Sequence, residues 1–145
     1  MAEQTTQSIE IAAPADRVMA VIADLPSYPQ WADGITRADV LESDAHGRPR
    51  VVHMALEKAV VRDEYTLAYD WGEDGLSVSW HLVAGQMQKA QNGSYVLTQH
   101  GDRTTVTYTL SVELNIPMIG LLRRKAEKVI IDTALKELKR RVEAD

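Results

Sequence analysis

The chain has 145 residues, a net charge of −5, an apolar fraction of 45% and no cysteine. This composition predicts one globular domain, residues 1–145, and the missing cysteine excludes disulfide bonds and thiolate chemistry. No apolar run of about 18 residues indicates a transmembrane helix, and no basic, apolar leader indicates a signal peptide, so we expect a cytoplasmic protein. The negative charge argues against DNA as a partner.

The beginning of the chain predicts one strand followed by two short helices. Thr5–Ala12 alternates between isoleucine and polar residues, which is typical of a half-buried strand. Pro14 opens a helix that Pro26 ends, because a proline disfavours helical geometry in the residue before it. A short second helix or turn follows over residues 27–34, with Gly34 as its stop.

From Ile35 onward the pattern changes to short strands separated by turn signals. These signals lie at residues 44–47, 72–75, Gly85, Asn92-Gly93 and Gly101-Asp102. Strands so close in sequence, joined by short turns, predict an antiparallel meander of about six strands.

The last long segment, Pro117–Val142, predicts a single amphipathic helix. Proline suits its first turn because the missing N–H would have no partner there, and its length would be about 38 Å. The apolar positions recur at helical spacing: Met118, Leu122, Ala126, Val129, Leu135, Leu138 and Val142. The expected fold is therefore α+β, a curved antiparallel sheet of about seven strands wrapped around this helix.

Basic residues gather on the same helix. Eight of the sixteen lysines and arginines lie between Arg123 and Arg141. One interpretation is a solvated helix face with cations near the C-terminus. The other is a docking surface for an acidic carrier protein, an anionic membrane or RNA.

The sequence contains no motif that assigns a cofactor or a metal. Neither a glycine-rich phosphate loop nor a G-x-S-x-G elbow is present. His46, His53, His81 and His100 do not pair at metal-ligand spacing. We therefore expect no cofactor and no metal site.

Asp63 is the one catalytic candidate, because it shares a predicted strand face with Tyr65, Leu67 and Tyr69. A carboxylate on an apolar face is unfavourable unless it is paired. One explanation is that Asp63 is solvated at the sheet edge or at a cavity mouth. The other is a buried acid with a raised pKa that exchanges a proton with a polyketide-like substrate.

Residues 9–35 resemble the opening of the START-like (SRPBCC, helix-grip) superfamily and are most similar to its polyketide cyclase/dehydrase branch. The matching motifs are Ala13-Pro14, Val18 and Val21, Asp24, Tyr28-Pro29 and Trp31, Gly93 to Tyr95, Thr104 to Tyr108, and the closing Ile116-Pro117. The resemblance covers essentially the whole chain. It implies a helix-grip fold with a cavity between the sheet and the C-terminal helix.

We expect this cavity to be mostly apolar with a few polar groups, the usual form of a small-molecule site. The candidate ligand-binding residues are Trp31, Met54, Tyr65, Tyr69, Trp80, Met87, Tyr95, Tyr108, Met118, Leu122 and Val129. The leading hypothesis is binding of a lipid, isoprenoid or polyketide-like molecule. The alternatives are a polyketide aromatase/cyclase or dehydratase, and a toxin-component-like protein that docks on RNA or a ribosome.

Overall fold

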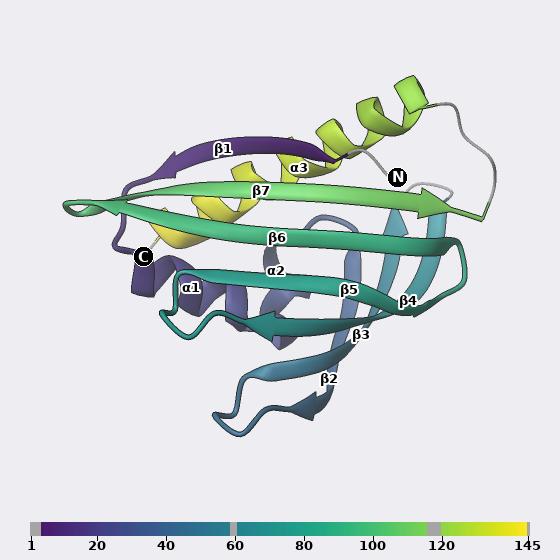
Figure 1. Ribbon diagram of the computed structural model, residues 1–145, viewed down its shortest axis with the longest axis horizontal. Coiled ribbons are helices and arrows are strands. Elements are labelled where there is room, and N and C mark those ends of the chain that lie inside the picture. The colour runs from purple at the N-terminus through teal and green to yellow at the C-terminus, as the bar shows by residue number, and fades with distance from the viewer. Residues whose placement is uncertain (1–3, 59–60, 116–119, 145) are drawn as a thin grey trace.

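The computed structural model describes residues 4–58, 61–115 and 120–144, with the side chains of α3 described from residue 123 onward. Figure 1 shows the elements along the chain. They are β1 (Thr5–Ile11), α1 (Ala15–Ala23), the 3₁₀ helix η1 (Leu25–Ser27), α2 (Tyr28–Trp31), β2 (Ile35–Ser43), β3 (Pro49–Lys58), β4 (Val61–Trp71), β5 (Ser77–Gly85), β6 (Gln88–His100), β7 (Arg103–Leu114) and α3 (Gly120–Glu143).

The seven strands form one antiparallel sheet in the order β1-β7-β6-β5-β4-β3-β2. Strands β2 to β7 follow one another as a meander, whereas β1 pairs with β7, so that Thr5 lies opposite Leu110. The helices lie on one side of this curved sheet (Figure 1), and α3 packs against β1, β7 and α1. The predicted α+β helix-grip architecture is confirmed. We call the side of the sheet that faces the helices its inner face.

The start of α1 is held by a side chain from the far end of β6. Pro14 is the N-cap residue with extended backbone angles. The first helical N–H, that of Ala15, donates a hydrogen bond to Gln99 Oε1 at 2.8 Å. This contact satisfies one of the backbone donors that every helix leaves unpaired at its N-terminus. The predicted helix start is therefore correct to within one residue.

The turn predicted at Asn92-Gly93 is wrong, because both residues lie inside β6. A Cβ atom added to Gly93 would lie 2.3 Å from Cζ2 of Trp80 on the neighbouring strand. Glycine in a strand interior often marks such a close approach. Gly93 therefore allows the Trp80 ring to pack directly against the β6 backbone. Gly47, Gly75 and Gly101, in contrast, lie in turns with positive φ, as the turn signals predicted.

The buried stripe of α3 differs from the predicted one in its first half. Leu135, Leu138 and Val142 are buried as predicted, but Ala126 is exposed. Val129, a predicted ligand-binding residue, is 59% exposed, so that prediction is wrong. The predicted positions Pro117 and Met118 lie outside the described residues.

The buried stripe of α3 differs from the predicted one because Glu127 lies inside the protein, with only 1% of its surface exposed. Its carboxylate accepts a hydrogen bond from Thr5 Oγ1 at 2.8 Å and from the Val112 N–H at 2.7 Å. Val112 lies beyond Leu110, the last β7 residue that β1 pairs with, so Glu127 supplies an acceptor where the strand ladder ends. The stripe therefore continues from Glu127 to Ile131, and Val129 is turned towards solvent.

The basic residues of α3 lie mainly on its solvent-exposed side, with Arg124, Lys125, Lys128, Lys136 and Arg140 all exposed. Within the described part of the chain, no helix has the length and apolar character needed to cross a membrane.

Candidate functional site

Aromatic side chains from four neighbouring strands meet on the inner face of the sheet. The centroid of the Trp80 ring lies 5.7 Å from that of Tyr69, 5.4 Å from that of Tyr95 and 5.7 Å from that of Tyr108. The strand register brings them together, since Tyr69 is opposite Trp80 and Tyr95 is opposite Tyr108. Cross-strand aromatic pairs of this kind stabilise a sheet. Here they also build one continuous aromatic surface.

The tyrosine hydroxyls on this surface are not paired within the described part of the protein. Tyr28 donates to the Ile22 carbonyl at 2.6 Å, but the hydroxyls of Tyr65, Tyr69, Tyr95 and Tyr108 bond to no described residue. Among fully buried side-chain atoms of the described residues, the two without a partner are both nitrogens. The four hydroxyl oxygens therefore still border space that a water molecule or a ligand atom can occupy.

These hydroxyls remain protonated under ordinary conditions. Burial is the main cause that raises the pKa of Tyr65, Tyr69, Tyr95 and Tyr108 above the ordinary phenol value. A smaller contribution to the raised pKa of Tyr65 comes from the negative charge of Asp63. Each tyrosine is therefore a neutral group that can donate or accept one hydrogen bond to a bound molecule.

Asp63 is buried, with 4% of its surface exposed, so the interpretation of a solvated carboxylate is wrong. Its Oδ1 accepts a hydrogen bond from the Met87 N–H at 3.0 Å, and its Oδ2 accepts one from Gln88 Nε2 at 3.0 Å. These bonds compensate part of the cost of burying the group. The two donors come from the β5–β6 connection and the first residue of β6, which cover the beginning of β4.

A chain of side-chain hydrogen bonds continues from Asp63 across the inner face. Gln91 Nε2 donates to Gln88 Oε1 at 2.6 Å, and Trp80 Nε1 donates to Gln91 Oε1 at 2.9 Å. Side chains three residues apart in a regular strand point to opposite faces. A register shift between Gln88 and Ala90 breaks this alternation, which lets both glutamines join the network.

Trp31 lies in α2 with its ring centroid 4.8 Å from that of Tyr28. Its Nε1 is buried and has no hydrogen-bond partner among the described residues. Since an indole nitrogen can only donate, this group requires an acceptor that those residues do not provide. The choice of Trp31 as a site residue remains a prediction.

The other predicted ligand-binding residues have different positions. Met54 is buried in the core, and Met87 is half-buried beside Asp63. Met118 lies outside the described residues, and so does the side chain of Leu122.

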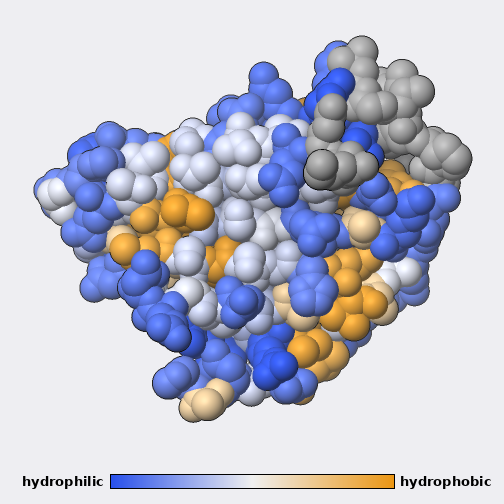
Figure 2. All heavy atoms as spheres, viewed as in Figure 1, coloured by the Kyte–Doolittle hydropathy of each residue, from blue (hydrophilic) through white to orange (hydrophobic). Residues whose placement is uncertain are grey.

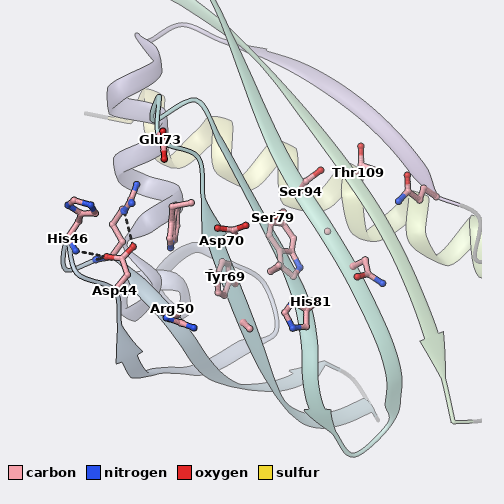
Figure 3. Close-up of a pocket in the computed structure, with 17 residues that line it drawn as sticks. Asp44, His46, Arg50, Tyr69, Asp70, Glu73, Ser79, His81, Ser94 and Thr109 are labelled. Atoms are coloured by element: carbon pink, nitrogen blue, oxygen red, sulfur yellow. Dashed lines mark hydrogen bonds and ion pairs between the residues drawn. The ribbon is translucent and has the colours of Figure 1, made fainter.

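A hollow of about 820 Å³ lies along the outer face of the sheet (Figure 3), and Tyr69, Trp71 and Trp80 also contribute to its lining. Its outward side chains are mostly polar, and they include Asp70, Ser79, His81, Ser94 and Thr109, with Asp44, His46 and Arg50 at the β2–β3 hairpin. Figure 2 shows the middle of this face as mostly pale and blue, with orange hydrophobic patches towards its left and right sides. The polar outward side chains of this hollow differ from the mostly apolar lining expected for the ligand site.

The sequence analysis missed Gln88, Gln91 and Glu127. Polar residues at these positions are expected to be exposed. Only the register shift in β6 and the pairing of the strands turn their side chains inward. Among the described residues, no group of three or more His, Asp or Glu side chains could hold a metal ion.

Comparison with known proteins identifies relatives of this fold. The family model described as polyketide cyclase / dehydrase and lipid transport matches residues 11–139. A START superfamily protein from Mycobacterium smegmatis has a similar structure, with a TM-score of 0.91 and 23% identity over 97% of each chain.

Two further structures are similar at lower identity. A protein from Thermus thermophilus has a TM-score of 0.82 and 22% identity over 98% of each chain. An aromatase/cyclase from a Streptomyces species has a TM-score of 0.81 and 16% identity, covering 99% of this chain and 94% of its own. No curated protein matches the sequence significantly.

Proposed function

Because the chain belongs to the polyketide cyclase / dehydrase and lipid transport family, we propose that it binds a small, mainly apolar molecule between the inner face of the sheet and α3. The observation that carries this proposal is the set of four inward-facing tyrosines whose hydroxyls have no partner among the described residues. Three of them, Tyr65, Tyr95 and Tyr108, are 7–8% exposed.

Four hydroxyls that pair with no described residue and still border open space are available to hydrogen-bond a bound molecule. A ligand that carries oxygen or nitrogen atoms on an apolar body would pair these hydroxyls while its body contacts the aromatic rings. An apolar lining with a few convergent polar groups is the usual composition of such sites.

Binding is favoured over proton-transfer catalysis by the contacts of Asp63. Both of its oxygens already accept hydrogen bonds from the protein, at 3.0 Å each. One hydrogen bond to each oxygen fixes the orientation of the carboxylate, which suits it to hold a ligand group in a set position. The contacts thus favour a role for Asp63 in binding and orientation.

The direct test is native mass spectrometry of freshly purified protein, followed by denaturing extraction of the bound molecule. We expect a noncovalent adduct that contains an apolar organic compound. A bare protein mass, together with no thermal shift across a panel of lipids and polyketide-like aromatics, would contradict the proposal.

A pair of variants locates the binding site. Tyr108→Phe removes one unpaired hydroxyl and should weaken retention of the extracted compound by about five- to tenfold, the value of about one hydrogen bond. Thr109→Val, the next residue on the outer face, is the matched control and should leave affinity unchanged. Equal affinities for the two variants would place the ligand elsewhere.

A further inference from the structure

We propose that Asp63 is the polar anchor of this site and that it receives a protonated amine, so the ligand is an amine carried on an apolar body. This inference rests on the proposed function and specifies its ligand class. Asp63 lies on the inner face of β4, two residues before Tyr65 on the same face. A hydrogen-bond chain links it to Trp80 in the aromatic surface.

The chain of hydrogen bonds has a fixed direction. The indole N–H of Trp80 can only donate, so Gln91 must turn its oxygen towards Trp80 and its amide nitrogen towards Gln88. Gln88 in turn donates to Asp63. All donors therefore point towards the carboxylate, which acts as the acceptor at the end of the chain.

The network leaves Asp63 with unused acceptor capacity. A carboxylate offers about four lone-pair positions, and the Met87 N–H and Gln88 amide occupy one on each oxygen. A bound ammonium has three N–H donors and can use the remaining positions. The β6 register shift beside Gln88 is the kind of local irregularity that re-aims side chains near binding sites.

No cation among the described residues forms an ion pair with Asp63. The nearest basic residues in the sequence are used elsewhere, since Arg62 pairs with Glu57 at 3.2 Å and Lys58 pairs with Asp33 at 2.8 Å. A buried carboxylate without an opposite charge is unfavourable. A ligand ammonium would supply that charge.

The surroundings of Asp63 favour a cation over an anion. In the described part of the chain, the buried ionisable side chains with a formal charge are two acids, Asp63 and Glu127, whereas the partly buried Arg123 of α3 pairs with Glu113 at 3.9 Å. A fatty acid or a phosphate-bearing ligand would bring like charge to this site, whereas an amine complements it.

The experiment compares three probes that share one apolar chain: dodecylamine, dodecanol and dodecanoate, each below its critical micelle concentration at pH 7. Binding is followed by tryptophan fluorescence and by calorimetry. We expect wild-type protein to bind dodecylamine at least tenfold more tightly than dodecanoate, with dodecanol between them. Equal or tighter binding of dodecanoate would overturn the inference.

Two variants with the same change in net charge separate a specific site from general attraction to an acidic protein. Asp63→Asn should reduce the amine preference to less than about twofold. Asp70→Asn, an exposed position on the outer face of β4, should retain it. An unchanged preference in Asp63→Asn, with folding verified by circular dichroism, would also overturn the inference.

The wild-type ranking requires no variant, so the inference stays testable even if Asp63→Asn does not fold. Failure of the two proposals can also be told apart. If none of the three probes binds and no compound is extracted from purified protein, the proposed function fails. If the probes bind without a headgroup preference, only the role of Asp63 fails.

Discussion

Raising the pH should unfold this protein through its tyrosines. The chain contains five tyrosines, and burial is the leading cause that raises the pKa of every one of them in the folded state. In the unfolded chain a phenol ionises near pH 10. Above that pH the unfolded state releases protons that the folded state retains, so stability falls as the pH rises. Below about pH 10 this contribution to stability is fully present.

The size of the effect follows from the number of groups. Each tyrosine that stays protonated in the folded state costs about 1.4 kcal/mol of stability at one pH unit above its unfolded pKa. Five such groups cost about 7 kcal/mol at pH 11 and about twice that at pH 12. A domain of this size typically has about 5–15 kcal/mol of stability. We therefore expect cooperative unfolding between about pH 11 and pH 12.

The assay is phenolate absorbance at 295 nm, recorded in parallel with far-ultraviolet circular dichroism. We expect both signals to change in one coincident transition, with all five phenols appearing together. In a variant with one buried tyrosine replaced, such as Tyr95→Phe, the free energy of unfolding should fall with pH about one fifth less steeply than in the wild-type protein. A rise in phenolate absorbance near pH 10, with the circular dichroism still native, would refute the reasoning. It would show that tyrosines ionise in the folded protein, and its amplitude would give their number.

Three substitutions test the packing that forms the site. Gly93→Ala places a methyl group on the Trp80 ring and should cost about 3 kcal/mol in urea unfolding, with a shifted tryptophan emission; native-like stability would contradict the close contact. Ile131→Ala removes a fully buried side chain and should cost about 2–5 kcal/mol. Its control, Val129→Ala on the exposed side of the same helix, should change stability by less than about 0.5 kcal/mol, and equal costs would refute the assigned helix face. Glu127→Ala leaves two hydrogen-bond donors unpaired and should lower the free energy of unfolding by about 2–4 kcal/mol, whereas an unchanged midpoint would show that its buried contacts are dispensable.

Local patterns in the sequence were enough to predict the order of the elements and the inner face of strands such as β4. Alternation places Asp63, Tyr65 and Leu67 on one side of β4, and the structure confirms that side as the buried one. The reason is that strand geometry turns successive side chains to opposite faces, so a short run of residues contains the information. Glycines at Gly47 and Gly75 likewise indicate turns through their own backbone conformation.

The tertiary structure decided the features that depend on residues far apart in the chain. Pairing of β1 with β7 exposes the Val112 N–H to α3, and this brings Glu127 inside and turns Val129 outward. The Trp80 ring on the adjacent strand explains Gly93, which by itself looks like a turn residue.

Whether Asp63 was buried or solvated could likewise be decided only in three dimensions. Its partners come from the β5–β6 connection and the start of β6, where a register shift aims Gln88 and Gln91 inward against the alternation of the strand. A sequence records which side chains can donate or accept hydrogen bonds. The distances and directions that join them depend on how strands separated along the chain are aligned, and only the folded sheet sets that alignment.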